Sequence, residues 1–167
     1  GGGAPYGTTT NAEYNGASWT GVGSFPLSYT YMGGCGTQTA ALSVAGDAYP
    51  TSPRNSNKAF EYNGSSWTTG GDLGTGRYAW TAGGAGLQPQ AFGGSSLNGT
   101  QDDWMTYGTN SPNYAYAQGY NGTSWSVRPA LATGRYDSTG TGTASAALCI
   151  GGRQPAFSTA TEEFTAP

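Results

Sequence analysis

The sequence predicts an all-β protein built from repeated units. Three observations lead to this prediction: a five-residue motif recurs, no segment shows sustained helical periodicity, and tyrosine and tryptophan together outnumber leucine, isoleucine, valine and phenylalanine. The motif is Asn-Gly-x-Ser-Trp, and its copies begin at Asn15, Asn63 and Asn121. Spacings of 48 and 58 residues leave room for about four short strands in each unit.

Each copy of the motif is typical of a β-hairpin turn. Asn-Gly favours a type I′ turn, because both residues tolerate positive φ. Aromatic residues, which suit strands, flank each turn: Tyr14 and Trp19, Tyr62 and Trp67, Tyr120 and Trp125. Because the tryptophans recur at the same position of each repeated unit, we expect them to pack the units together rather than to bind a ligand on their rings.

Other positions repeat with the motif. An apolar residue lies six positions after each tryptophan, at Phe25, Leu73 and Leu131. Small-residue segments that end at glycine are expected to be equivalent strands, at 40–46, 91–94 and 146–152. A glutamate precedes the repeated aromatic residue at Glu13, Glu61 and Glu163. These glutamates could pair with the recurring Arg77 and Arg135, or all of these charges could simply be solvated.

Residues 77–135 show the order of the repeat best. Arg77 is followed by Gly93-Gly94, Tyr120, Trp125 and Arg135. This order resembles the kelch repeat of β-propellers, and the Asn-Gly-Thr-Ser-Trp variant resembles repeats of bacteriophage fibre and other virion or surface proteins. The resemblance implies an all-β fold of kelch-like, four-stranded propeller blades. It implies no particular activity, since one fold hosts many functions.

The repeats predict one domain, 1–167, of about three blades. We expect a partial unit with only its third and fourth strands, two full units and a unit without its last strand, at about 1–29, 30–76, 77–134 and 135–167. Three blades are fewer than a usual closed ring contains. Four solutions remain open: a six-bladed ring of two chains, a head-to-tail filament that exchanges the surplus strand, a fragment of a longer propeller, and a closed three-bladed unit.

The composition excludes several classes of function. The chain has no histidine, which removes histidine-based catalysis and the commonest metal ligand. Only 6 lysines and arginines stand against 9 acidic residues, so no basic surface is expected for nucleic acid or a membrane. We expect no enzyme activity, no cofactor and no membrane insertion. The sequence starts without Met or a signal peptide, which indicates a processed product or a fragment, and an extracellular, cell-surface or virion location.

An insertion at 97–118 carries the candidate ligand or partner contacts. These are Asp102, Asp103, Trp104, Tyr107, Tyr114 and Tyr116. Rings among polar side chains suit a glycan, whereas a subunit contact or simple packing is the other interpretation. Adjacent carboxylates do not flank a substrate bond as glycosidases require, although a weak Ca²⁺ site is conceivable.

Two further features have structural explanations. Asn63, Asn98 and Asn121 begin glycosylation sequons, but two of these are the repeated turns themselves. Cys149 lies in an apolar strand and is expected to be a small core residue rather than the disulfide partner of Cys35.

The function that the sequence favours is structural. An open blade leaves unpaired backbone groups at its edge, and such edges recruit strands. We therefore expect a protein that assembles with itself, without catalysis, by β-strand complementation into a filament or a surface component. The alternative is a lectin-like propeller module that binds surface glycans for adhesion.

Overall fold

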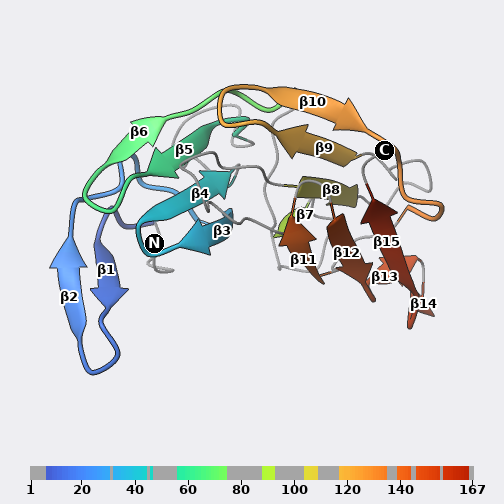
Figure 1. The fold of residues 1–167 in the computed structure, drawn as a ribbon, viewed down its shortest axis with the longest axis horizontal. Helices are drawn as coiled ribbons and strands as arrows, with labels where there is room; N and C mark the ends of the chain where they lie inside the picture. The colour runs from blue at the N-terminus through green and yellow to red at the C-terminus, as the bar shows by residue number, and fades with distance from the viewer. Residues whose placement is uncertain are drawn as a thin grey trace.

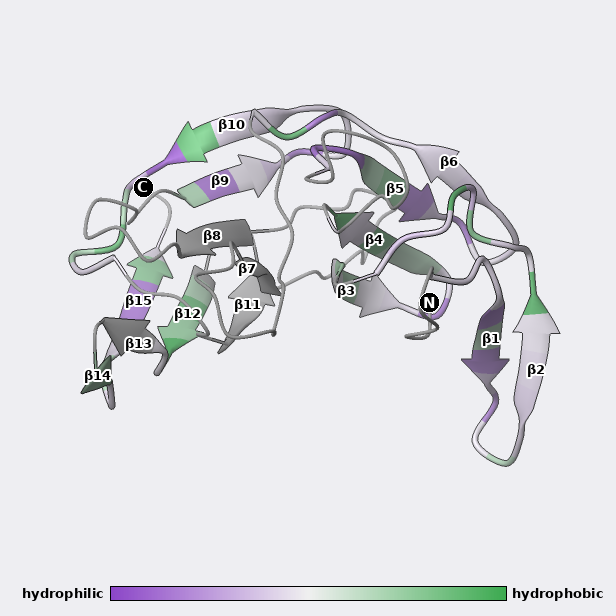
Figure 2. Ribbon diagram, turned by 180° about the vertical axis from the view of Figure 1, so that it is seen from behind, coloured by the Kyte–Doolittle hydropathy of each residue, from purple (hydrophilic) through white to green (hydrophobic). Residues whose placement is uncertain are grey.

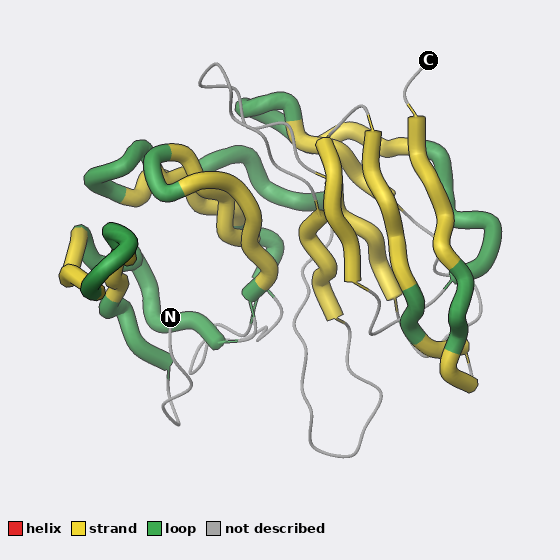
Figure 3. The backbone as a smooth tube through the Cα atoms, turned by 60° about the horizontal axis from the view of Figure 1, so that its bottom comes forward, coloured by secondary structure: helices red, strands yellow, loops and turns green. Residues whose placement is uncertain are grey.

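The computed structural model describes residues 7–30, 32–44, 46, 56–74, 88–92, 104–108, 117–134, 139–143, 146–154 and 156–165. Within these ranges the chain forms β-strands, turns and loops, and no helix. The prediction of an all-β chain is therefore confirmed for the part that the structure describes. Figure 3 shows how the strands alternate with loops along the backbone.

Two four-stranded antiparallel sheets form the middle of the molecule (Figure 1). The first contains β3 (Gly33–Thr37), β4 (Ala40–Val44), β5 (Ala59–Tyr62) and β6 (Trp67–Thr69). The second contains β7 (Gln88–Phe92), β8 (Trp104–Gly108), β9 (Ala117–Tyr120) and β10 (Trp125–Arg128). In both sheets each strand pairs with the next strand along the chain, so both are simple meanders.

Smaller sheets lie at the two ends of the molecule. Near the N-terminus, β1 (Asn11–Tyr14) and β2 (Trp19–Val22) form a two-stranded hairpin. Near the C-terminus, β11 (Thr139–Thr143), β12 (Ala146–Ile150) and β15 (Thr161–Thr165) form a three-stranded sheet. The short hairpin of β13 (Arg153–Gln154) and β14 (Ala156–Phe157) connects β12 to β15.

The sheets follow one another in chain order along an arc (Figure 1). The β1–β2 hairpin lies at one end of the arc and the β11–β12–β15 sheet lies at the other. On the inner side of the arc, β7 contacts both β3 and β11. The first strands of the three larger sheets are therefore neighbours.

The core consists of three separate clusters, and each lies between successive units. The first contains Phe25, Tyr29 and Phe60 with Met32 and Trp67 against them. The second contains Leu42, Val44, Ala59, Leu73 and Tyr120 with Cys35 and Trp125. The third contains Ala117, Ala147 and Cys149 with Leu131 and Phe164. Figure 2 shows the hydrophobic residues of β4 and β12, which supply Leu42 and Val44 to the second cluster and Ala147 and Cys149 to the third.

The repeated turns differ from the expected type I′ geometry. Tyr14 is paired with Trp19, so the loop holds four residues rather than two. The Asn15 side-chain oxygen accepts hydrogen bonds from the backbone N–H groups of Ala17 and Ser18, at 3.0 and 2.9 Å. The Asn63 and Asn121 turns repeat this pattern. Asparagine thus acts through its side chain, as in an Asx-turn, while the glycine after it takes the positive φ.

The second sheet also departs from the expected equivalence. Residues 91–94 were predicted to match β4 and β12, which are second strands. Ala91 and Phe92 instead belong to β7, which is the outermost described strand of its sheet. The strand paired between β7 and β9 is β8, and it lies inside the predicted insertion 97–118. Part of the insertion is therefore sheet rather than an added loop.

Glycine four residues after the tryptophan lets one unit approach the next. A Cβ on Gly71 would lie 2.2 Å from the carbonyl oxygen of Thr123, in the turn of the following unit. A Cβ on Gly23 would lie 2.5 Å from the carbonyl oxygen of Ser65, in the corresponding turn. Both contacts are with backbone, which cannot move aside as a flexible side chain would.

Replacing Gly71 therefore tests the unit interface. Gly71→Ala should lower the free energy of unfolding by about 1–3 kcal/mol, because the new methyl group overpacks the interface. The lower stability should appear as a lower midpoint of urea unfolding. Gly21→Ala is the matched control, since a Cβ there has no neighbour within 4 Å. Equal midpoints for the two variants would contradict the close approach.

Candidate functional site

A tyrosine and a tryptophan flank the turn of each hairpin that carries the Asn-Gly-x-Ser-Trp motif. The tyrosine is the last residue of the first strand, and the tryptophan is the first residue of the second. In β1–β2, β5–β6 and β9–β10 the two rings face each other across the strands, with centroids 5.3, 5.0 and 5.0 Å apart. Two of the tryptophans also pack against the unit before them. Trp67 meets Phe25 with a centroid separation of 4.9 Å, and Trp125 packs against the cluster that contains Leu73. The residue six positions after one tryptophan thus packs with the tryptophan of the next unit.

Trp19 has no such partner in the described residues. Its side chain is 71% exposed, although it carries the same ring as its two counterparts. Tyr14 beside it is 48% exposed, whereas Tyr62 and Tyr120 are 5% and 0% exposed. The N-terminal hairpin therefore presents to solvent the pair that the other units bury.

A hydrogen bond from tyrosine to glutamate links successive units. The Tyr62 hydroxyl donates to Glu13 Oε1 at 2.6 Å, and Gln38 donates to the other oxygen at 3.0 Å. One unit later, the Tyr120 hydroxyl donates to Glu61 Oε1. In both cases the tyrosine belongs to the later unit and the glutamate to the earlier one. Glu13 and Glu61, two of the three repeated glutamates, are therefore tyrosine acceptors, a role that the sequence did not reveal.

These contacts hold the tyrosines in their protonated form. The hydrogen bond to Glu13, burial and the negative charge of Glu13 together raise the pKa of Tyr62 to about 12. Burial and the hydrogen bond to Glu61 raise the pKa of Tyr120 to about 12, although the Gly71 N–H, 3.2 Å from the hydroxyl, acts in the opposite direction.

The third interface lacks both partners of this hydrogen bond. Phe164 stands where the next tyrosine would be, and Gly119 stands where the glutamate would be. Arg128 lies over Gly119, since a Cβ there would be 2.5 Å from its Nε atom. Pro129 takes the position of Gly71 in the previous unit. Three linked changes thus distinguish the interface that β15 forms from the two before it.

The two partly buried indoles, Trp67 and Trp125, differ in their hydrogen bonding. Trp125 Nε1 donates to the Gly71 carbonyl at 3.0 Å. Trp67 Nε1 is buried and has no partner among the described residues. The carbonyl of Gly23, which corresponds to Gly71, instead accepts from the Asn11 side chain at 3.2 Å. The Asn11 side chain therefore donates to the carbonyl oxygen that would accept from Trp67 if this unit matched the next one.

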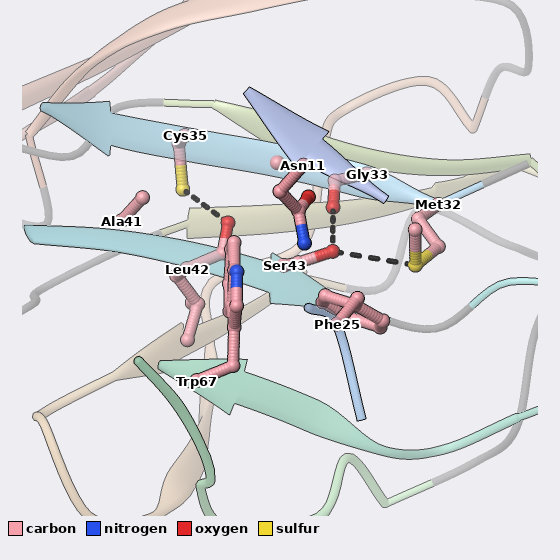
Figure 4. A pocket seen from close by; sticks show the side chains of 10 residues that line it. Asn11, Phe25, Met32, Gly33, Cys35, Ala41, Leu42, Ser43 and Trp67 are labelled. Atoms are coloured by element: carbon pink, nitrogen blue, oxygen red, sulfur yellow. Dashed lines mark hydrogen bonds between the residues drawn. The ribbon is translucent and has the colours of Figure 1, made fainter. Parts of the chain in front are cut away.

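A cavity of about 370 Å³ lies over β3 and β4, beside the N-terminal hairpin (Figure 4). Its hydroxyl, thiol and amide side chains have partners, whereas the Trp67 indole N–H has none among the described residues. The Ser43 hydroxyl lies 3.4 Å from both the Gly33 carbonyl and the Met32 sulfur, and the Cys35 thiol is 4.0 Å from the Leu42 carbonyl. The hairpin that faces this sheet has only two strands, against four in the sheet itself. The cavity therefore lies where the facing unit has no described first and second strands.

A second, smaller groove lies beside β15. It measures about 110 Å³, and Leu131, Cys149 and Phe164 are among the residues that line it. Leu131 corresponds to Leu73, and Phe164 corresponds to Tyr120. In the previous unit Leu73 and Tyr120 pack with Trp125. The groove thus carries two of the three parts of a tryptophan site.

The outer edge of β15 has no described partner strand. The Gly151 N–H donates to the Ala160 carbonyl at 2.9 Å, so Ala160 faces β12. Backbone groups alternate along a strand, so the N–H groups of Thr161, Glu163 and Thr165 face away from β12. The structure describes no strand that pairs with these three N–H groups, whereas the two middle sheets have four strands.

Most of the predicted ligand or partner contacts and both predicted arginines lie outside the described residues or their described side chains. Asp102, Asp103, Tyr114, Tyr116, Arg77 and Arg135 lie outside the described residues. Trp104 and Tyr107 lie on β8, for which the backbone alone is described. The glycan, Ca²⁺ and Arg–Glu hypotheses therefore stay predictions. Asn15, Asn63 and Asn121 begin the turns, and Trp19, Trp67 and Trp125 begin β2, β6 and β10.

Other chemistry is sparse in the described part of the chain. Cys35 and Cys149 form no disulfide, as expected, and Cys149 is buried. Among the residues that the structure describes, no three metal-ligating side chains gather at one point. No described segment forms a helix long and apolar enough to cross a membrane.

No protein-family model matches the chain, and no curated protein matches it.

The pKa shifts predict how stability depends on pH. Unfolded tyrosine titrates near pH 10, and the folded values lie near 12. The stabilisation from both hydroxyls is therefore complete below about pH 10 and is lost as the pH rises towards 12. The double variant Tyr62→Phe/Tyr120→Phe should lose most of this dependence in urea titrations between pH 8 and 12. Tyr14→Phe is the control, and a double variant with an unchanged pH profile would contradict the tyrosine–glutamate links.

The hydrogen bonding of the two indoles predicts that the same substitution will lower the free energy of unfolding by different amounts at Trp67 and Trp125. Trp125→Phe should lower the free energy of unfolding by about 1 kcal/mol more than Trp67→Phe, because only Trp125 donates a hydrogen bond. Thermal unfolding of the two variants measures this difference directly. A larger loss for Trp67→Phe would show that the hydrogen-bond assignment is wrong.

Proposed function

We propose that this protein is a non-enzymatic structural component that assembles with copies of itself by β-strand complementation. The observation that carries the proposal is the free edge of β15 in a three-stranded sheet that follows two four-stranded ones. Unpaired edges of this kind are templates for another strand. A strand added to β15 would bring the last sheet to the same size as the others.

Kelch-like propeller blades are the architecture that fits this proposal best. Each middle sheet is a four-stranded meander, and its last hairpin carries the Asn-Gly-x-Ser-Trp motif. The first strands of successive sheets, β3, β7 and β11, are neighbours, as first strands are around a propeller axis. The partial units at the two ends make the chain suited to continue from copy to copy.

The β1–β2 hairpin is the strongest candidate for the donor. It supplies the third and fourth strands of a unit, whereas the C-terminal sheet supplies the first three. Three of the four residues of β2 are exposed, and an isolated two-stranded hairpin is only marginally stable in water. A contact between unlike surfaces of two copies need not close, so it generates a filament or, with suitable rotation, a ring.

The surface chemistry agrees with a structural role outside the cell or in a virion. Only 9% of the residues are charged, and the net charge is −3. Weak repulsion between copies leaves edge pairing and aromatic burial free to drive association.

Electron microscopy with light scattering on one sample tests the proposed assembly. We expect regular filaments or closed rings of several chains, with a mass that rises with concentration. A monodisperse monomer at all concentrations would overturn the proposal.

A proline at the edge of β15 tests the strand that accepts the partner. Glu163→Pro removes an outward N–H without removing a bond to β12, so it should abolish assembly and leave the monomer folded. Glu163→Ala, which keeps the N–H, should assemble as the wild type does. Assembly of Glu163→Pro with unchanged mass would exclude β15 as the paired edge.

A further inference from the structure

Within the described residues, the two ends of the chain lack complementary parts of one unit interface. Trp19 at the N-terminal end has no described apolar residue of an earlier unit to pack on. Leu131 at the C-terminal end is such an apolar residue, and no described tryptophan of a later unit covers it. The same contact is complete at Phe25–Trp67 and in the cluster of Leu73 with Trp125.

We infer that the groove of Leu131, Cys149 and Phe164 is a receptor for the indole of Trp19 from a second copy of this chain. This inference rests on the proposed function and names the residues through which the copies recognise each other. The occupant is a second copy because β2 and the groove lie at opposite ends of the arc within one chain (Figure 1).

The chemistry of the groove suits an indole. In the preceding unit a ring pair of Tyr120 and Trp125, 5.0 Å apart, fills the same position. Phe164 provides the first ring, and Leu131 provides the aliphatic surface on which the second would lie. The Trp19 ring gains most from such a site, since it is 71% exposed in the isolated chain.

The strand pairing that brings Trp19 there is an exchange. β1 and β15 carry the same glutamate–aromatic pair, Glu13-Tyr14 and Glu163-Phe164. β15 of one copy can therefore take the place of β1 beside β2 of the next, with Phe164 opposite Trp19 as Tyr14 is now. The β15–β2 ladder between copies would replace the β1–β2 ladder within one copy, so the backbone hydrogen bonds would stay about equal in number. The free energy of association would then come from the burial of aromatic surface.

The cavity over β3 and β4 fits the same contact. It marks where the unit facing this sheet has no described first and second strands. In the exchanged arrangement β11 and β12 of the other copy would supply these strands. One contact between copies would thus fill the groove of one chain and the cavity of the next.

Three variants and one peptide test the inference. Trp19→Ala and Leu131→Trp should remain monomeric in light scattering, the first because it lacks the indole and the second because its own indole fills the groove. Val127→Trp is the matched control for Leu131→Trp, since Val127 is 62% exposed on β10, away from the groove. It should assemble as the wild type does. Far-UV circular dichroism should show all three folded, and Trp19→Ala removes only an exposed ring.

The peptide probe consists of residues 15–24. It should bind the wild-type chain in calorimetry, and a peptide with Trp19→Ala should bind at least about tenfold more weakly. Leu131→Trp should not bind the probe.

The outcomes separate this inference from the proposed function. If the wild type assembles and Trp19→Ala assembles equally well, the groove is not the receptor, although strand complementation stands. If the wild type stays monomeric but binds the peptide in a Trp19-dependent way, the receptor is real and the assembly proposal fails. If the wild type neither assembles nor binds the peptide, both are overturned.

Discussion

The packing of a tryptophan against the unit before it is the contact on which the described structure depends. Phe25 and Leu73 follow the last strand of one unit in the chain, and they are buried against Trp67 and Trp125 of the next unit. Aromatic rings take part in all three clusters: Phe25, Tyr29, Phe60 and Trp67 in the first, Tyr120 and Trp125 in the second, and Phe164 in the third. Stability is thus distributed over interfaces between neighbours, as in repeat proteins, and among the described residues the first and last units have one face without a partner.

The tyrosine–glutamate hydrogen bonds give these interfaces a direction. The hydroxyl always belongs to the later unit and the carboxylate to the earlier one, as in Tyr62–Glu13 and Tyr120–Glu61. Where Phe164 replaces the tyrosine, Gly119 replaces the glutamate, so no buried carboxylate is left without a partner. A contact between copies that continues the repeat would have the same direction, with the N-terminal end of one copy meeting the C-terminal end of the next.

Much of this arrangement could be predicted from the repeat, because hairpin turns and aromatic pairs are local. The all-β class, the tryptophan phase and the free state of Cys149 follow from sequence spacing and strand pattern. The tyrosine–glutamate bond could not be predicted, since its partners are 49 residues apart for Glu13 and Tyr62. The sequence signal for this bond is that the glutamate and the tyrosine are both replaced in the last unit interface, by Gly119 and Phe164. The prediction that Ala91 and Phe92 belong to a second strand was wrong. The second strand of that sheet is β8, and it lies in a segment whose sequence does not match the repeat.

Hydrogen exchange along β15 is the most direct test of the central claim, which is that this edge pairs with another copy. The outward amides of Thr161, Glu163 and Thr165 should exchange at least about tenfold more slowly in concentrated than in dilute solution, because a new strand would take their hydrogen bonds. Amides of β10, an edge strand that already completes a four-stranded sheet, should not change. Equal exchange of the β15 amides at all concentrations, in a sample whose mass increases, would show that the copies associate through another surface.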